Sequence, residues 1–484
     1  MPAARAPSPQ LTGIKIAVTA IDLEQAEHRG IAYFTQNLIK SLHELGADVY
    51  LITALKCQRC TPSQLAKLPT ATALSVQLAD LVEQLESPPK SKPFNARSLE
   101  SWIRTILWAS KLLLRFWMQA GRVNAEQVLP VGNQLQARTQ GSQRLSYVPW
   151  IAGFIQVPAI YALASLRSRG WLPRPPKLDL RPAGIHLMIT TCPLNINAIT
   201  APGHSPRVLQ VIHDCFALES AKHPDDPWQL CNRLRDAFNS DCLFVSEHTQ
   251  TTVSALLEQP IHTSQAAILH QPPSLSTENL EAAALVPHMR GLGEPFVVFN
   301  ASVVPRKNLL FLIQLFLGSS LPVAGVKLVV SGHLRGDAYG QAVRERCNGQ
   351  SSIELWGYVN ELEKAWLYLR ALALASPSLL EGFGIPVLDG SCLGLPVLAS
   401  DIPSHAEIAA LLGHPPGLKL LPNNNNLAWL SALDGLNATG RGPSPAELEQ
   451  RLRSYRQHQQ QLSNGFQQQL ASSIQRTTRP AKPR

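Results

Sequence analysis

One strand–loop–helix–strand unit constrains this chain more than any other stretch. Residues 371–375 form an apolar run that predicts a short buried strand, and the polar residues 376–378 end it. Gly382, Phe383 and Gly384 follow, and a helical pattern begins near Pro386, a residue that suits the first turn of a helix. Glycines at such a junction let backbone N–H groups approach a ligand, and a helix N-terminus favours an anion. The unit predicts an anion-binding edge of a parallel sheet, although an ordinary α/β unit would have the same pattern.

Two carboxylates belong to this unit. Glu381 lies on the loop, and Asp389, with seven residues between them, lies about a turn into the helix. This spacing lets both side chains face one bound ligand. Residues 392–401 then predict the end of the helix, a turn and a second buried strand.

The block resembles the Glu-x7-Glu signature of retaining glycosyltransferases of family 4, also called glycosyl transferases group 1, which have the GT-B fold. The match begins with Pro377 and Ser378 and continues through Gly382, Phe383, Gly384, Ile385 and Pro386 to Gly394, Pro396 and Glu407. One residue departs from the pattern. Asp389 stands where the family usually has Glu, so the charge is kept but its reach is one methylene shorter.

The N-terminal part predicts a βαβ unit. Residues 14–20 and 49–53 are strand-like, residues 34–45 have helical periodicity, and Gly30 lies in the loop before that helix. The unit resembles the glycine-rich loop of the same family that faces the donor diphosphate. The resemblance implies that Gly30 lies near this diphosphate, while Ala32 replaces the family's second glycine.

The family pattern resumes at residue 185. Residues 185–190 and 207–212 are apolar runs, and His213 follows the second of them. A histidine at a strand end is often only structural. Here it resembles the family's His-Asp pair, whose histidine lies near the transferred sugar. Residues 242–246 predict a strand leading into a capped helix and are similar to the family's Val-Ser-x-x-Thr stretch.

A second Rossmann-like half follows the glycine-containing stretch 287–295. Arg306 and Lys307 lie between a predicted strand (296–299) and a helix, where paired cations suit a diphosphate leaving group. An isolated pair of this kind is usually a surface feature, but the run matches the family, with Asn300 replacing a common glycine. Two more strands are predicted at 326–332 and 353–359. The resemblance places Gly357, Tyr358 and Val359 beside the nucleotide base.

The charge of the chain is concentrated in one segment. The 484 residues carry a formal net charge of +9, and residues 88–181 hold 14 Lys and Arg against 3 Asp and Glu, a net of +11. The basicity therefore says little about the rest of the chain. The aromatic residues of this segment lie on apolar helical faces, which disfavours nucleic-acid binding. Cys57 and Cys60 are the only close pair among eight cysteines, so zinc is not expected, and the thiols are expected to be reduced.

Residues 57–183 leave the family pattern and predict an insert. Residues 99–118 predict a basic helix with an apolar face that includes Trp102, Trp108 and Trp117 and is interleaved with Arg104, Lys111 and Arg115. Residues 121–143 are polar and predict a mobile connector. Residues 145–166 lack charge, but Pro149, Gly153 and Pro158 interrupt them and disfavour a membrane span. The insert either caps the core or attaches to anionic lipid.

We therefore expect an α/β protein with the GT-B fold, in which two Rossmann-like domains face a central cleft and a helical insert extends the N-terminal domain. The expected parts are a disordered leader (1–13), an N-terminal acceptor domain (14–290, insert about 57–183), a C-terminal nucleotide-sugar domain (291–475) and a basic tail (476–484). Residues 466–474 are expected to cross back to the N-terminal domain. The chain lacks a signal peptide's apolar core, which predicts a cytoplasmic protein, with attachment to the inner face of the cytoplasmic membrane left open.

The resemblance implies retaining transfer of a sugar from a nucleoside diphosphate sugar to a glycan or lipid-linked acceptor, in polysaccharide or cell-envelope biosynthesis. It implies neither a metal nor another cofactor, and front-face displacement assisted by the leaving phosphate. The implied catalytic residues are Glu381, His213, Arg306 and Lys307. The implied donor-binding residues are Gly30, Gly357, Tyr358, Val359, Gly382, Phe383, Gly384, Ile385 and Asp389, of which Asp389 would hold the ribose.

Other classes stay open at this point. A catalytically weak homologue that binds sugar nucleotides and acts in regulation or scaffolding would explain the departures at Ala32, Asn300 and Asp389. A phosphorylase-like enzyme would share the fold, but no lysine is placed to bind pyridoxal phosphate.

Overall fold

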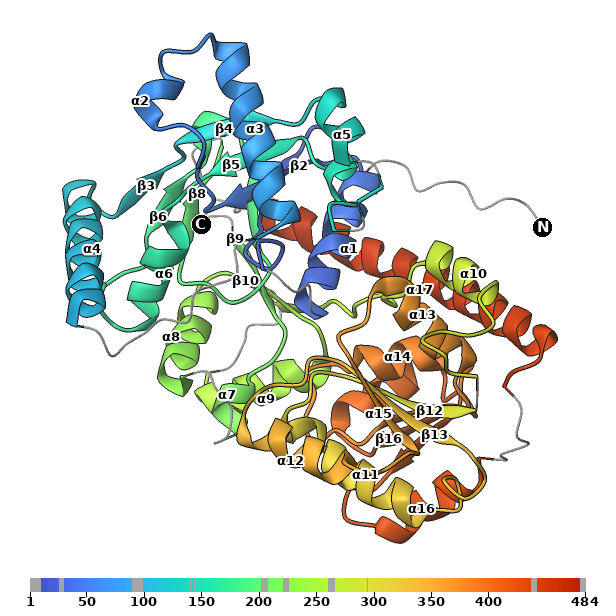
Figure 1. The fold of residues 1–484 in the computed structure, drawn as a ribbon. Coiled ribbons are helices and arrows are strands. Elements are labelled where there is room, and N and C mark those ends of the chain that lie inside the picture. The colour runs from blue at the N-terminus through green and yellow to red at the C-terminus, as the bar shows by residue number, and fades with distance from the viewer. Residues whose placement is uncertain are drawn as a thin grey trace.

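The computed structural model describes residues 10–25, 30–88, 99–139, 141–142, 144–201, 208–220, 226–259, 266–293, 295–436 and 442–478. Two domains, each built around a parallel sheet, lie one above the other in Figure 1. Most of the predicted leader, residues 1–9, and most of the predicted tail, residues 479–484, lie outside the described residues.

The N-terminal domain contains an eight-stranded sheet in the order β11-β10-β9-β7-β1-β2-β5-β4. All its pairs are parallel except β4 with β5. The buried strands form because near-continuous apolar runs suit a sheet covered on both faces. Its strands are β1 Lys15–Thr19, β2 Asp48–Thr53, β4 Gln127–Pro130, β5 Gly153–Gln156, β7 Leu187–Thr190, β9 Val208–Ile212, β10 Asp241–Phe244 and β11 Ala266–Ile268.

Three shorter strands form a separate parallel sheet in the order β3-β6-β8, with bounds Arg122–Asn124, Lys177–Asp179 and Asn197–Ile199. The helices of this domain are α1 Gly30–Glu44, α2 Pro62–Leu65, α3 Thr70–Glu86, α4 Leu99–Met118, α5 Asn133–Thr139, α6 Ile160–Ser168, α7 Phe216–Glu219, α8 Pro227–Ala237 and α9 Glu247–Leu257. Two 3₁₀ turns, η1 and η2, cover Val148–Trp150 and Arg181–Ala183.

The C-terminal domain contains a six-stranded, wholly parallel sheet in the order β14-β13-β12-β15-β16-β17. Its strands are β12 Phe296–Asn300, β13 Lys327–Ser331, β14 Ile353–Gly357, β15 Ala373–Ser376, β16 Val397–Ser400 and β17 Leu418–Leu421. Its helices are α10 Thr277–Ala284, α11 Leu309–Gly318, α12 Ala338–Cys347, α13 Glu361–Arg370, α14 Ile385–Cys392, α15 Pro403–Leu411, α16 Asn426–Asp434 and α17 Pro445–Thr478, with the 3₁₀ turn η3 at Pro305–Lys307. The predicted strand–loop–helix–strand unit is confirmed as β15, α14 and β16.

Both sheets change their strand order near the middle, at β1 between β2 and β7 and at β12 between β13 and β15. In open α/β sheets, ligands bind beyond the carboxyl ends of the strands at such points. The loops that carry the predicted site residues all leave carboxyl ends of strands. The two sheets therefore direct these loops toward one shared region.

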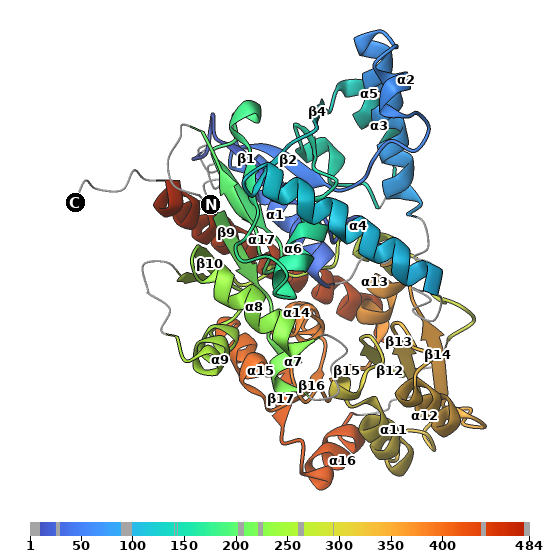
Figure 2. The ribbon, with the colours of Figure 1, turned by 90° about the vertical axis from the view of Figure 1, so that its left-hand side faces the viewer.

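The last helix, α17, joins the two domains and is visible in Figures 1 and 2 as the long helix that runs from one domain to the other. Its first half packs on α10, α13 and α14 of the C-terminal domain. Its second half reaches the N-terminal domain, where Phe466 packs edge-on against Phe34 and the Gln467 Nε2 donates to Glu44 at 2.6 Å. The predicted return crossing of residues 466–474 is confirmed. Helix α10 precedes residue 290 and packs on α13 and α17, so it lies with the C-terminal domain.

The structure decides one open question about the insert, the place of residues 145–166, and corrects one prediction. Residues 145–166 do not form a membrane-facing surface, because they supply η1, the buried strand β5 and most of α6, and Tyr147, Phe154 and Ile155 are essentially unexposed. An uncharged run suits a protein core as well as a lipid phase. Because β5 lies between β2 and β4 in the sheet, these residues belong to the core. The predicted mobile connector at 121–143 instead forms β3, β4 and α5.

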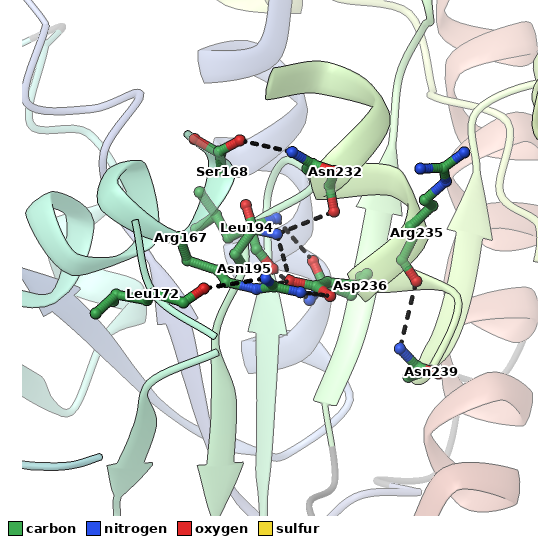
Figure 3. Close-up of polar contacts among 10 residues, drawn as sticks. Arg167, Ser168, Leu172, Leu194, Asn195, Asn232, Arg235, Asp236 and Asn239 are labelled. Atoms are coloured by element: carbon green, nitrogen blue, oxygen red, sulfur yellow. Dashed lines mark hydrogen bonds and ion pairs between the residues drawn. The ribbon is translucent and has the colours of Figure 1, made fainter. Parts of the chain in front are cut away.

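A polar network fastens α6 to α8 (Figure 3). Arg167 makes two bonds to Asp236, from Nε at 2.9 Å and from Nη2 at 2.8 Å. Asn195 donates to the same carboxylate at 2.5 Å and to the Asn232 carbonyl at 3.0 Å, and Asn232 donates to the Ser168 carbonyl at 2.9 Å. A bidentate arginine–carboxylate pair is geometrically specific, so this part of the insert is fixed to the domain.

The helix predicted at 99–118 is confirmed as α4, which lies on the outside of the N-terminal domain (Figure 1, left edge). Phe116 and Ala109 are buried against the domain. Leu107, Leu114, Trp117 and Met118 are exposed by 56, 62, 57 and 78%. The side chains of Trp102, Arg104, Trp108 and Arg115 lie outside the described set. Among the described residues, no helix is long and apolar enough to cross a membrane.

Candidate active site in the cleft between the domains

An open cavity of about 1590 Å³ lies between the two domains and is lined by residues of both. It brings together almost every site residue predicted from the sequence: Gly30, His213, Arg306, Lys307, Tyr358, Val359, Glu381, Gly382, Phe383, Gly384, Ile385 and Asp389. Gly357 is not among the lining residues. Its carbonyl instead accepts the N–H of Gly332 at 2.7 Å and so holds the neighbouring loop in place.

The predicted cations lie against the first predicted carboxylate. The turn η3 in the loop after β12 carries Arg306 and Lys307, and Asn308 ends this turn in the left-handed region at a φ of 55°. The Lys307 ammonium donates to Glu381, and Arg306 Nη1 donates to its other oxygen at 3.1 Å. The Ser378 hydroxyl also donates to Glu381, at 2.7 Å. The pair is therefore not a surface feature.

Burial and charge act in opposite directions on this pair. Burial would raise the pKa of Glu381, but the Lys307 and Arg306 cations outweigh it and lower that pKa to about 2. Burial lowers the pKa of Lys307 to about 8, although Glu381 opposes this shift. Both groups are therefore mainly charged at pH 7. The cluster of Glu381, Arg306 and Lys307 combines one carboxylate with two cations, which suits an anionic ligand at this place in the cavity.

The loop from Gly382 to Gly384 presents free backbone donors to the cavity. Gly384 has a φ of +110°, and an added Cβ there would lie 2.9 Å from the His405 ring, so only glycine fits. Among the described residues, the N–H groups of Phe383 and Gly384 have no acceptor. They precede α14, whose N-terminus favours negative charge. These amides are available to an anionic group or to a hydroxyl group of a bound ligand.

His213 follows β9 and faces the cavity as a neutral imidazole. Burial lowers its pKa to about 4, although the hydrogen bond to a backbone carbonyl opposes this shift. Its Nε2 lies 2.9 Å from the Thr191 carbonyl oxygen, which accepts the Nε2–H of a neutral ring. The ring packs edge-on against Phe34 at 4.8 Å. His213 is therefore held rigidly, with Nδ1 unprotonated.

The second carboxylate, Asp389, is fully buried in α14 at the edge of the cavity. One oxygen accepts the Ser274 N–H at 2.6 Å, and the other accepts the Ser274 hydroxyl at 2.6 Å. The Lys364 ammonium lies 3.8 Å away. Burial raises the pKa of Asp389, while Lys364 and Ser274 oppose the shift. Asp389 therefore reaches the cavity together with Ser274, which also lines it.

Three lining residues at this end were missed by the sequence reasoning. Tyr33 of α1 donates to Glu361 of α13, and its ring faces the Lys364 ammonium at 4.9 Å. Lys364 donates to the Ser274 hydroxyl at 2.8 Å. Glu361 and Lys364 share a face of α13 after the Asn360 cap, but nothing in a single sequence links them to Tyr33, which lies 328 positions from Glu361.

The structure also places Ala32 and Asn300, two of the three residues that depart from the family pattern. Ala32 is buried inside α1, while Gly30, Ile31 and Tyr33 line the cavity. Asn300 lines the cavity and donates to the Ser331 hydroxyl at 3.0 Å, so its side chain is ordered by the neighbouring strand. No group of three or more His, Cys, Asp or Glu side chains that could hold a metal occurs in the described part of the chain.

Two parallel-sheet domains that face a cavity at their carboxyl ends, with a final helix crossing between them, define the GT-B fold. Solved structures support this class. Sucrose-phosphate synthase from Thermosynechococcus elongatus aligns with a TM-score of 0.54 at 13% identity, over 96% of this chain and 98% of that one. Anabaena HepE, solved in complex with UDP and glucose, aligns with a TM-score of 0.50 at 12% identity, over 96% and 99%.

Sequence comparison finds a family model that matches part of the C-terminal domain. Residues 287–425 match the family described as glycosyl transferases group 1, which confirms the resemblance over this segment. O-antigen chain mannosyltransferase B from Escherichia coli is 30% identical over 165 residues, 31% of this chain. That match spans 41% of the relative's own length.

Proposed function

We propose that the protein is a retaining glycosyltransferase that moves a sugar from a nucleoside diphosphate sugar to a glycan or lipid-linked acceptor in polysaccharide or cell-envelope biosynthesis. One observation carries the proposal: Arg306, Lys307, Glu381 and the free amides before α14 meet in one cavity that His213 closes from the other domain. The relative named O-antigen chain mannosyltransferase B supports a glycan chain as the acceptor class.

The proposed roles follow from charge. Arg306, Lys307 and the helix amides stabilise the diphosphate as it gains charge on leaving, so no metal or other cofactor is required. Glu381, with the amides of the loop, holds the transferred sugar, and neutral His213 lies on its opposite side. Because Lys307 and Arg306 neutralise Glu381, this carboxylate is a poor nucleophile, which favours front-face displacement assisted by the leaving phosphate.

A ligand panel tests this function. UDP-, GDP- and ADP-sugars and their free diphosphates are added to the purified protein, and the melting temperature is measured. A ligand at 100 times its Kd adds about 2.7 kcal/mol to the free energy of unfolding, enough for a clear shift. A panel without any shift would contradict the proposal. A shift without transfer or hydrolysis would favour the catalytically weak homologue.

We further propose that α4 attaches the protein to the cytoplasmic face of an anionic membrane. Its exposed apolar residues occur at positions 107, 114, 117 and 118, a spacing that places them on one helical face. Lys111 on the same helix is exposed, and the sequence of the helix also contains Arg104 and Arg115, so its basic residues complement anionic lipid headgroups. Attachment of this kind would bring a lipid-linked acceptor close to the cleft.

A further inference from the structure

The carbonyl group of Gly382, in the loop after Glu381, is held by hydroxyl groups of the other domain. The Ser246 hydroxyl donates to it at 2.6 Å and the Thr249 hydroxyl at 3.1 Å. Ser246 also caps α9, because its oxygen accepts the Thr249 N–H at 3.0 Å. Both side chains are buried, so these bonds are shielded from water.

The same contact excludes any side chain at position 382. A Cβ added to Gly382 would lie 2.1 Å from the His213 carbonyl oxygen, a distance that backbone cannot accommodate without moving. The loop of the C-terminal domain is therefore seated directly on the end of β9 and the start of α9 of the N-terminal domain.

A second set of contacts fastens the same place. Glu407 of α15 accepts the N–H groups of Glu247 at 2.7 Å and His248 at 3.2 Å, at the N-terminus of α9. It also binds the His270 Nε2 at 2.7 Å, and the His270 ring stacks on Phe383 at 5.5 Å. The carboxylate complements the positive end of α9, so it pulls the two domains together beside the loop.

The direction of one backbone amide follows from this anchoring. In a trans peptide the C=O and the following N–H point in opposite directions. Because the Gly382 carbonyl points to Ser246 and Thr249, the Phe383 N–H points away from them. That N–H has no acceptor among the described residues, and Phe383 lines the cavity.

We propose that Ser246 and Thr249 are positioning residues that orient the Gly382–Phe383 peptide, so that the Phe383 amide donates to the sugar of the bound donor. This inference rests on the proposed function. Because the two hydroxyls belong to the N-terminal domain, the sugar end of the site is complete only when the domains are closed. The nucleotide end, which is formed mainly by the C-terminal domain, does not depend on them.

Thr249→Val and Thr249→Ser test the proposal, since the first removes the hydroxyl at constant volume and the second restores it. Calorimetry measures two affinities: one for the nucleotide sugar that gives the largest shift in the ligand panel, and one for the corresponding free nucleoside diphosphate. Steady-state kinetics gives kcat. We expect Thr249→Val to lower kcat about tenfold. This is less than the loss that follows complete removal of one oriented hydrogen-bond donor, because the variant only loosens the orientation of the Phe383 amide. It should also reduce the affinity for the nucleotide sugar but not for the diphosphate. Thr249→Ser should behave as the wild type.

Matched controls separate positioning from stability. Ser254 lies on the same helix, and its hydroxyl donates to the Gln250 carbonyl. The control variant Ser254→Ala should therefore change neither kcat nor the two affinities. Gly382→Ala should reproduce the selective loss by pushing the loop off His213. Gly417→Ala, where an added Cβ meets only ordinary contacts, should not.

Equal loss of diphosphate and nucleotide-sugar affinity in Thr249→Val, or a lower melting temperature with unchanged kcat, would overturn the proposal. A wild type that binds the diphosphate but shows no added affinity for any sugar nucleotide would also overturn it. A wild type that binds neither would refute the proposed function itself, and the ligand panel detects this before any variant is made.

Discussion

The proton of Lys307 gives the most direct test of the proposed diphosphate site. The perturbation is Lys307→Arg combined with a pH series from 6.5 to 10. Burial lowers the pKa of Lys307 to about 8, whereas an arginine stays charged throughout this range. Glu381, with a pKa of about 2, and the Arg306 guanidinium both lie beside Lys307 and do not titrate there.

The magnitude follows from the fraction of protein in which Lys307 carries its proton. If the diphosphate binds only the protonated form, about one molecule in ten is competent at pH 9. The affinity for the free nucleoside diphosphate should therefore fall about tenfold between pH 7 and pH 9, or about 1.4 kcal/mol. Calorimetry at each pH measures this. The Lys307→Arg protein should bind with little pH dependence, and titration of the nucleobase is common to both proteins and cancels.

Equal pH slopes for the wild type and Lys307→Arg would refute the reasoning, because the ammonium would then not contact the diphosphate. Melting temperatures at pH 7 check that the arginine is accommodated. The stability of the unliganded protein should have the opposite dependence. The folded-state pKa of Lys307 lies below the ordinary lysine value of 10.5. The unfolded chain therefore binds more protons between pH 8 and 10.5, and this group's contribution to stability rises with pH there.

Three further outcomes are expected. Glu381→Gln should lose turnover more than diphosphate affinity. The folded protein holds Glu381 ionised, so the wild type loses stability as the pH falls from 4.5 to 2, and the variant should lack this part of the acid destabilisation. Urea unfolding at pH 5 and pH 3 would measure the difference. Asp389→Asn should weaken binding of free UDP or GDP by calorimetry, because its carboxylate orders Ser274 at the nucleotide end, and unchanged affinity would contradict that role. The protein should co-sediment with anionic vesicles and be released by high salt. The double variant Leu114→Ser, Trp117→Ser should not co-sediment, and its melting temperature should be unchanged because both side chains are exposed. Wild-type protein that does not co-sediment would refute membrane attachment through α4.

Most of the fold could be predicted from the sequence, because its determinants are local. The apolar run at 371–375, the glycines at 382 and 384 and the helix that follows specify a strand, a loop and a helix through short-range periodicity and backbone freedom. Arg306 and Lys307 were also predicted at the cavity, because they lie between a strand and a helix and their run resembles that of the family. These features depend on residues close in the chain.

The tertiary structure alone decided which environment and which partners these residues have. The uncharged stretch 145–166 fits a lipid surface or a core equally well by composition, and only its pairing with β2 and β4 assigned it to the core. Ser246 meets Gly382 across 136 positions, and Ser274 meets Asp389 across 115. Such contacts depend on how the two sheets dock, and a single sequence carries no periodic signal for the distance between residues on different domains.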